Sequence, residues 1–330
     1  VMALCRPFFQ RLVLHWHAAG LAKWLETSVQ QRTRSTTYRM LQKADLSIVL
    51  STFNRADAEK LFAQRILVVN NGIPDPCPEF DHEVLPLRRR QGAARRALFE
   101  RLSLPPVPAP GGAEPAGVVR VLYLAHCTRE KGLFDACEGV LSANRSLRAH
   151  GNPAFFKLSV AGMFVRKDEK RAFQSLLKDP QAAREIEYLG FVSGEQKLAL
   201  LRDSDLFCFP TCYPNENQPV NLIEAMAFGL PILTTRWRSI PELFPRSYPG
   251  LVAPNSPGQV AGALIQLAAQ ETGETFREMF LANFTLERHL ASLARALASI
   301  ETVRPDPTPD VLAAMGARPA GSPAVPGALP

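Results

Sequence analysis

What this sequence lacks narrows its class before any motif is considered. No uninterrupted apolar run of about eighteen residues or more occurs, and no charged segment followed by an apolar one opens the chain. We therefore expect neither a membrane span nor a secretory signal. The six cysteines include no Cys-x-x-Cys pair, which predicts free thiols in a reducing compartment and no zinc site. The expected location is the cytoplasm, either in solution or peripherally on the inner face of a membrane.

The start of the chain lacks the Gly-rich turn that follows the first strand of a complete nucleotide-type domain. The first strand-like run comes at residues 10–16, and no such turn precedes it. We therefore expect the N-terminal domain to be incomplete.

The composition is that of a folded protein with an anionic partner. Of the 330 residues, 46% are hydrophobic and 21% are charged, which is enough to bury a large core, and the length suggests two domains. The net charge of +7 suits nucleotides, lipid phosphates or a bilayer surface, and it equally suits nucleic acid. Charge alone does not choose among these partners.

The most informative stretch lies between residues 206 and 242. Leu206–Phe209 has the composition of a buried parallel strand, and a loop containing prolines follows it. Asn221–Phe228 is rich in helix-forming residues, and Ile232–Thr235 is expected to be a second buried strand. Open α/β sheets bind ligands in such strand-loop-helix-strand units, outside the carboxyl ends of the strands. The free amides at residues 220–222, which open the helix, should attract an anion such as phosphate.

Two carboxylates flank those amides. Glu216 lies in the loop ahead of them, and Glu224 lies eight residues later, one turn into the helix. Their side chains could accept hydrogen bonds from hydroxyl groups on opposite sides of a diphosphate. Taken singly, Glu224 could equally be an acid that stabilises the helix dipole, and Glu216 a solvated loop residue. The run Glu-Ala-Met-Ala-x-Gly-x-Pro that begins at Glu224 favours the functional interpretation.

This segment resembles the Glu-x7-Glu motif of the retaining glycosyltransferases of family 4, which have the GT-B architecture. The resemblance covers about residues 10–300 and is strongest over 121–242. It implies an α/β fold of two Rossmann-like domains that face each other across a cleft. It also implies that Glu216, Asn217 and Gln218 face the donor sugar, that the amides of Val220, Asn221 and Leu222 hold the diphosphate, and that Glu224 binds the ribose. The sequence departs from the pattern at Pro219, where many members have Gly and therefore an amide.

The segment after the apolar strand 118–125 is expected to supply the rest of the donor site. The family has Arg, four residues, then Lys-Gly at this turn, and here Lys131 and Gly132 match while the Arg position holds His126. The resemblance places Lys131 on the diphosphate as a flexible point charge, and Arg129 could replace the missing cation. A solvated helix start is the alternative for both cations. The resemblance also implies that the backbone of Phe191 and Val192 contacts the nucleotide base.

The first strand ends in His15-Trp16-His17, ahead of a loop of small residues. Two alternating histidines without a third ligand are a weak metal signal, and a satisfied core histidine is as good an interpretation from the residues alone. The resemblance favours His17 as a residue that points into the interdomain cleft beside the sugar. We therefore expect His17 and Glu216 as catalytic residues, with no metal and no cofactor.

The chain is expected to divide into a partial acceptor-side domain at 1–74, a basic, Pro-rich linker at 75–117, a nucleotide-sugar-binding domain at 118–300 and a disordered Pro/Ala-rich tail at 301–330. A short helix at 87–102 carries arginines that either face solvent or hold a membrane surface or an acceptor phosphate. Asp203 and Asp205 are interpreted as structural. The helix ending near Ile300 is expected to cross back onto the first domain, as in the family.

The preferred function is retaining sugar transfer in the synthesis of a polysaccharide, glycolipid or other glycoconjugate. Its expected partners are a nucleotide-sugar donor, a sugar or lipid-linked acceptor and an anionic membrane surface, but no nucleic acid. The main alternative is a truncated protein of the same architecture that binds nucleotide without turnover. A second alternative is a nucleic-acid-binding protein that uses the arginines of the 87–102 helix, for which binding would fall steeply with salt.

Overall fold

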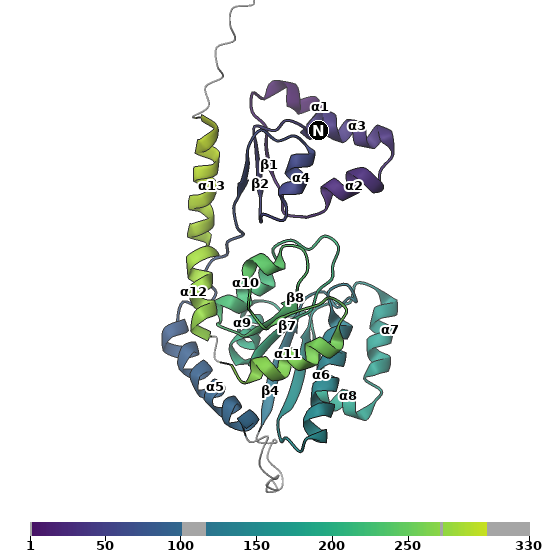
Figure 1. The fold of residues 1–330 in the computed structure, drawn as a ribbon, viewed down its shortest axis with the longest axis vertical. Helices are drawn as coiled ribbons and strands as arrows, with labels where there is room; N and C mark the ends of the chain where they lie inside the picture. Colours follow the sequence, from purple (N-terminus) through teal and green to yellow (C-terminus); the bar gives the residue numbers. More distant parts are fainter. Residues whose placement is uncertain (1, 101–116, 271–272, 302–330) are drawn as a thin grey trace, which may run out of the picture.

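The computed structural model describes residues 2–100, 117–270 and 273–301, and these form two α/β units (Figure 1). The smaller unit contains the N-terminal elements, and the last long helix runs alongside both units. Each unit has one sheet, and every strand pair in the two sheets is parallel. The expected α/β class with two Rossmann-like domains is confirmed.

The first unit is built on a three-stranded sheet with the order β1-β2-β3. All four residues of its middle strand are buried, as is typical of a strand covered on both faces. The buried carboxylate of Asp57 accepts hydrogen bonds from the amides of Gly20 and Ala22, both at 2.8 Å, and so fixes the loop that follows β1. The elements of this unit are α1 (Met2–Cys5), η1 (Arg6–Phe8), β1 (Val13–His15), α2 (Leu21–Thr27), α3 (Gln31–Leu41), β2 (Leu46–Val49), α4 (Arg55–Lys60) and β3 (Ile66–Val68).

The second unit is built on a six-stranded sheet with the order β6-β5-β4-β7-β8-β9. The chain builds outward from β4 to one edge and then returns to the other side of β4, so the strand order reverses between β4 and β7. Such a reversal opens a crevice at the carboxyl ends of the two strands. The elements are β4 (Val118–Leu124), α6 (Leu133–Ala149), β5 (Phe155–Ala161), α7 (Lys167–Leu176), α8 (Pro180–Glu185), β6 (Ile186–Gly190), α9 (Gly194–Asp203), β7 (Leu206–Phe209), α10 (Val220–Ala227), β8 (Ile232–Thr235), η4 (Ile240–Leu243), β9 (Leu251–Val252) and α11 (Pro257–Ala268).

The basic helix between the two units packs into the second one. It is α5 (Leu85–Glu100), which follows the π-helical turn η2 (Phe80–Val84), and its Phe99 belongs to the main hydrophobic core. Arg88 is 5% exposed and donates hydrogen bonds to three backbone carbonyls of the second unit. Arg88 is therefore neither a solvated surface residue nor available to a membrane, an acceptor phosphate or nucleic acid.

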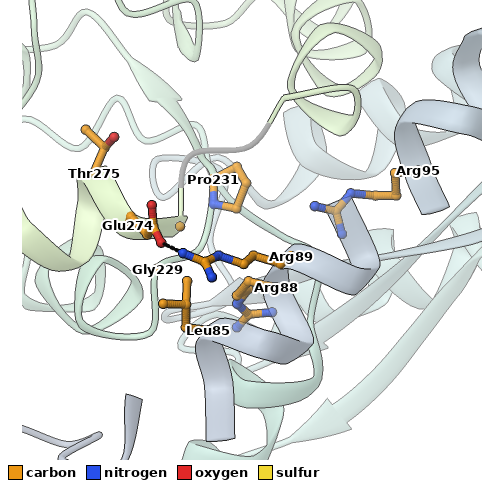
Figure 2. A pocket seen from close by; sticks show the side chains of 9 residues that line it. Leu85, Arg88, Arg89, Arg95, Gly229, Pro231, Glu274 and Thr275 are labelled. Carbon is orange, nitrogen blue, oxygen red and sulfur yellow. Dashed lines mark hydrogen bonds and ion pairs between the residues drawn. The ribbon is translucent and has the colours of Figure 1, made fainter. Parts of the chain in front are cut away.

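Arg95, on the same face of α5, is also buried and anchors the acidic segment before β7. Its guanidinium lies 2.6 Å from Asp205, whose second oxygen accepts from the amide of Arg120 at 2.8 Å. The structural interpretation of Asp205 is confirmed. Figure 2 shows that Arg89 instead pairs with Glu274 beside a small cavity of about 140 Å³.

Two C-terminal helices, α12 (Gly273–Asn283) and α13 (Leu286–Glu301), connect the units. Ile73 forms a bridge at the junction, because its amide donates to Phe284 at 3.0 Å and its carbonyl accepts from Leu286 at 2.8 Å. Farther along α13, Ala296 packs with Leu46, Ile48 and Val69 in a separate core under the first sheet. The expected return of this helix to the first domain is confirmed.

The structure also bears on the expected free cysteines and on the expected lack of a membrane span. All six cysteines lie in the described residues and are free thiols, as expected. Among the described residues, no helix is both long enough and apolar enough to cross a membrane. The remainder of the expected linker, at 101–116, and the expected tail beyond 301 lie outside the described residues.

Candidate active site

Two loops meet where the strand order reverses, one after β4 and the other after β7. Gly132 allows their close approach, since its φ is +80° and a Cβ atom placed there would lie 2.2 Å from the carbonyl oxygen of Pro210. The amide of Cys212 also donates to the carbonyl of Glu130, at 2.7 Å. These backbone contacts hold the two loops in one fixed arrangement at the crevice.

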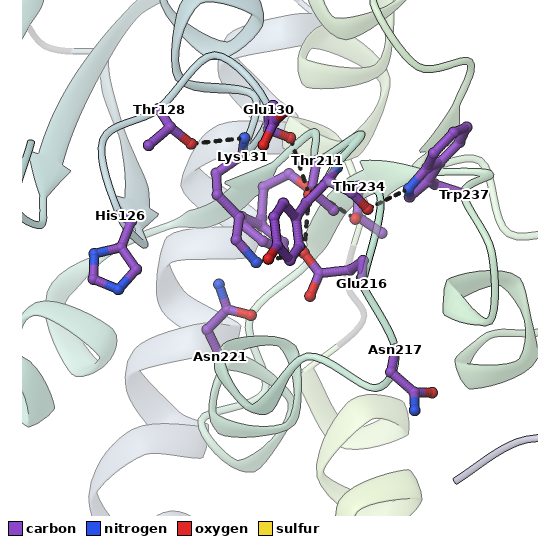
Figure 3. Close-up of polar contacts among 12 residues, drawn as sticks. His126, Thr128, Glu130, Lys131, Thr211, Glu216, Asn217, Asn221, Thr234 and Trp237 are labelled. Atoms are coloured by element: carbon purple, nitrogen blue, oxygen red, sulfur yellow. Dashed lines mark hydrogen bonds and ion pairs between the residues drawn. The ribbon is translucent and has the colours of Figure 1, made fainter. Parts of the chain in front are cut away.

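Lys131 and Glu216 form an ion pair across these loops (Figure 3). The Nζ atom of Lys131 lies 2.8 Å from Oε2 of Glu216, which also accepts a hydrogen bond from the Thr211 hydroxyl at 2.9 Å. The carboxylate is well shielded, because Glu216 is 6% exposed. The ammonium also lies 4.3 Å from the centre of the Tyr213 ring, a cation–π contact. The structure thus brings together two residues that the family resemblance assigned separately to the diphosphate and the sugar.

The amino end of α10 opens beside this ion pair. Pro219 is the N-cap residue and supplies no side-chain cap, while Val220 is 44% exposed. The amide of Leu222 donates to Pro219 at 3.2 Å, but within the described residues those of Val220 and Asn221 have no hydrogen-bond acceptor. Two free amides and the positive end of the helix dipole therefore face the crevice, as an anion site requires.

Asn221 ties this helix end to the first strand of the unit. Its Nδ2 donates to the carbonyl of Leu124, at the end of β4, at 2.9 Å. Its Oδ1 is buried and has no partner among the described residues. Figure 3 shows Asn221 beneath Lys131 and Glu216, so the three side chains gather at this end of the helix.

Glu224 lies one turn farther along α10 and pairs with Lys197, whose Nζ is 2.6 Å away. Both side chains are partly buried, at 16% and 29% exposure. Lys197 was not among the residues expected from the sequence. It lies on α9, directly after the Phe191–Val192 turn, and only this order of elements pointed toward it.

Side chains in and after β8 hold the Glu216 loop in place. Each donates to a backbone carbonyl of the loop or of the end of β7, so the loop is held without help from a ligand. The contacts are Thr234 to Phe209 at 2.8 Å, Thr235 to Thr211 at 2.5 Å, Trp237 to Tyr213 at 2.8 Å, and Ser239 to Asn217.

Asn217 and Gln218, both expected at the sugar, lie differently from Glu216. Figure 3 shows the Asn217 side chain directed away from Glu216, and its buried Nδ2 has no partner in the described part of the chain. The Gln218 amide group reaches the first unit, where it accepts from the Asn71 amide at 2.5 Å and donates to Asn70 at 3.1 Å. The Gln218 side chain is therefore occupied as an interdomain contact.

His17 is exposed and lies two residues beyond the end of β1. Its ring centroid is 4.3 Å from that of His15, which lies 6.2 Å from His289 of α13. Burial, followed by the charges of His17 and His289, lowers the pKa of His15. Within the described residues His17 shares no hydrogen bond with Glu216, so the catalytic pairing of the two residues stays a prediction.

The remaining expected donor residues lie around the same edge of the sheet. A cavity of about 830 Å³ beside Lys131 is lined in part by Arg129, whose guanidinium lies 4.5 Å from the centre of the Phe134 ring. At the end of β6, Val192 is buried and Phe191 is 68% exposed. The contacts of these two residues with the nucleotide base stay a prediction.

A six-stranded parallel sheet of this order, a second Rossmann-like unit and an open helix end at the strand reversal define a protein of the GT-B class. The chain belongs to the family described as glycosyl transferases group 1, whose sequence model matches residues 112–283.

Similar proteins carry related names. The protein WcaL of Escherichia coli, provisionally named a colanic acid biosynthesis glycosyltransferase, is 31% identical over 197 residues, which are 56% of this chain and 46% of that protein. The amylovoran biosynthesis glycosyltransferase AmsK of Erwinia amylovora is 27% identical over 190 residues, 55% of this chain and 44% of its own. The chain thus spans about half the length of the curated relatives it matches.

Solved structures share the fold at low sequence identity. Anabaena HepE, determined in complex with UDP and glucose, is 16% identical with a TM-score of 0.63, over 90% of this chain and 74% of its own. A glycosyltransferase from Rickettsia africae is 15% identical with a TM-score of 0.65, over 91% of this chain and 74% of its own.

Proposed function

We propose that this protein transfers a sugar from a nucleotide-diphosphate donor to an acceptor hydroxyl, with retention of configuration at the anomeric carbon. The observation that carries this proposal is the ion pair of Lys131 and Glu216 beside the open amino end of α10. The arrangement supplies a cation, free amides and a carboxylate at one point, which suits a leaving diphosphate joined to a sugar that carries hydroxyl groups.

The chemical task is to stabilise the negative charge that builds on the departing diphosphate. The free amides of Val220 and Asn221 and the ammonium of Lys131 do so when they are aimed at the phosphate oxygens. Lys131 must first leave Glu216, and the carboxylate released from this pair then accepts a hydrogen bond from a sugar hydroxyl. His17 approaches the sugar from the first unit. For retention, the acceptor hydroxyl attacks from the face that the diphosphate leaves and passes its proton to that diphosphate as the bond from sugar to phosphate breaks. The mechanism we propose uses no metal and no cofactor.

The nucleoside occupies the other end of the site in this proposal. Glu224 accepts from the ribose hydroxyls, Lys197 holds that carboxylate in place, and the base lies by Phe191 and Val192. Arg129 adds positive charge near the phosphates. Uridine is the first base to test, because the structure of the similar HepE was determined with UDP.

The acceptor is proposed to be a sugar or a lipid-linked sugar in polysaccharide synthesis, as the names of the relatives suggest. We further propose that the protein works in the cytoplasm and contacts the anionic inner face of a membrane, to which its net charge of +7 would be attracted.

Turnover tests the function directly. The full chain is supplied with a panel of nucleotide-diphosphate sugars and a mixture of oligosaccharide acceptors, and free nucleoside diphosphate is measured over time. We expect one donor to be consumed with an acceptor, and proton NMR of the product to show the anomeric configuration of the donor. Tight nucleotide binding without any turnover would favour the non-catalytic alternative, and an inverted product would contradict retention.

The role of Glu224 predicts a defect that depends on the ribose. Glu224→Ala should weaken UDP binding about tenfold or more, because a hydrogen bond to a charged group is lost. The same change should have little effect on 2′,3′-dideoxy-UDP, which lacks the hydroxyls. Calorimetric titration of both nucleotides measures this, with the exposed Glu187→Ala as the matched control. An equal loss of affinity for the two nucleotides would remove the ribose assignment.

A further inference from the structure

Arg238 lies on the loop between β8 and η4 at the boundary of the two units. Its guanidinium carbon is 5.7 Å from the centre of the Trp237 ring and 5.9 Å from that of Phe53, which belongs to the first unit. A Cβ atom placed on Gly20, in the loop that follows His17, would lie 3.9 Å from both terminal nitrogens of this guanidinium. The cation is therefore held between the two units.

This guanidinium has no anionic partner. Within the described residues Arg238 makes no hydrogen bond or ion pair, and its Nε is buried without an acceptor. The buried arginines Arg95 and Arg277 differ from Arg238 in this respect, since Arg95 pairs with Asp205 and Arg277 pairs with Asp75, each at 2.6 Å. A buried N–H group without an acceptor is costly unless a ligand supplies one.

A second donor without an acceptor belongs to Asn217, which is hydrogen-bonded to the residue that follows Arg238. The Nδ2 of Asn217 is buried and unpartnered, although Asn217 is only 4% exposed. The hydroxyl of Ser239, the neighbour of Arg238, donates to the backbone carbonyl of this same Asn217. Two adjoining segments thus each present a shielded N–H group that lacks an acceptor, and this excess of donors favours an anion.

The backbone of Arg238 is in an unfavourable conformation. Its φ is +49°, in the left-handed region that a residue with a Cβ adopts at a cost. The strain persists although a glycine would relieve it, and such strain is often kept where a side chain has a function.

We propose that Arg238 binds the acidic group of an anionic acceptor, a carboxylate or a phosphate monoester. The inference rests on the proposed function and adds the substrate class to it. The Oδ1 atom of Asn215, the neighbour of Glu216, lies 3.5 Å from the Cβ position on Gly20 that is also close to the Arg238 guanidinium. Arg238 is therefore at the sugar end of the site, on the side of the His17 loop. In the proposed function the donor diphosphate lies at Lys131 and the amides of Val220 and Asn221, which leaves Arg238 for a different anion.

The test uses the full chain saturated with UDP and three small probes in calorimetric titrations. Methyl glucuronide carries a carboxylate, glycerol 3-phosphate carries a phosphate, and methyl glucoside is neutral. We expect at least one acidic probe to bind about tenfold or more tightly than the neutral one, since a bidentate arginine contact to an anion is strong. Arg238→Gln should abolish this preference. Arg236→Gln, which removes an exposed arginine of the same loop, should keep it.

The outcomes distinguish a carboxylate from a phosphate monoester, and the role of Arg238 from the proposed function. A preference for the glucuronide alone identifies a carboxylate, and one for the glycerol phosphate alone identifies a phosphate monoester. Equal binding of all three probes, no binding of either acid, or a preference that survives Arg238→Gln overturns the proposal. UDP affinity is measured first: if UDP does not bind, the proposed function fails, whereas lost acid preference in a protein that binds UDP overturns only the role of Arg238.

A second variant guards against a merely structural effect. Arg238→Gly removes the charge and relieves the positive φ, so it should abolish the preference for acids without lowering the midpoint temperature of unfolding. A lower midpoint together with an unchanged preference for acids would mean that Arg238 only packs against Trp237 and Phe53.

Discussion

Glu216→Gln is expected to reduce sugar transfer by about 10²-fold or more and at the same time to strengthen UDP binding, by roughly tenfold. The loss of transfer follows from replacing the carboxylate that, in the proposed function, contacts the sugar in the transition state. The gain in binding follows because Lys131 no longer has to leave a charged partner 2.8 Å away before it meets a phosphate. Opposite signs for the two quantities are the distinctive feature of this prediction.

The measurements are the rate of nucleotide release with acceptor and the dissociation constant of UDP. Glu187→Gln is the matched control, because Glu187 pairs with Lys157 at 3.4 Å on the surface of the same unit. That change should alter neither quantity. A Glu216→Gln protein that transfers sugar at the original rate would show that Glu216 only supports the loop. One that binds UDP more weakly would contradict the proposed release of Lys131.

Gly132→Ala is expected to destabilise the second unit by about 3 kcal/mol or more and to weaken UDP binding at least tenfold. The added methyl group would have to occupy a point 2.2 Å from the carbonyl oxygen of Pro210, so the two loops must separate. Because Lys131 immediately precedes Gly132, the ammonium would leave the amino end of α10. Urea unfolding and UDP titration measure the two effects.

Gly151→Ala separates this clash from the backbone preference. Gly151 also has a positive φ, +66°, but no atom lies within 4 Å of its added Cβ, so we expect a loss of only about 1 kcal/mol and unchanged UDP binding. Equal losses of stability in the two variants would mean that the loops adapt to the methyl group, and that their contact does not fix Lys131.

The order of elements around the site was predictable because it depends on local signals. The strands before and after α10 are short apolar runs bounded by prolines, and the structure places them at Leu206–Phe209 and Ile232–Thr235. The open end of α10 was predictable for the same reason, since Pro219 can cap no amide with its side chain. Lys131 was assigned because Lys131 and Gly132, which follow an apolar strand, match the pattern of the family.

Contacts between distant segments were not predictable, because tertiary packing selects the partners. Lys197 and Glu224 are 27 residues apart and lie on different helices. Gln218 turns to the first unit because acceptors and donors at Leu50, Asn70 and Asn71 are available there.

The buried arginines of α5 show that residue type alone does not predict burial. Arg88 and Arg95 look like surface residues by type, yet they are buried at 5% and 6% exposure. Their spacing of seven residues, with Phe99 four residues later, places all three on one helical face. That spacing could have indicated a buried face of the helix. Arginine is so common in this chain that the cluster was interpreted as solvent-exposed instead.

The most direct test of the account is a crystal structure of the full chain with UDP bound. We predict that the terminal phosphate lies within hydrogen-bond distance of the amides of Val220 and Asn221, that Lys131 has moved from Glu216 to a phosphate oxygen, and that Glu224 contacts the ribose. A nucleotide bound away from the amino end of α10, or one bound there with Lys131 still paired to Glu216, would contradict it.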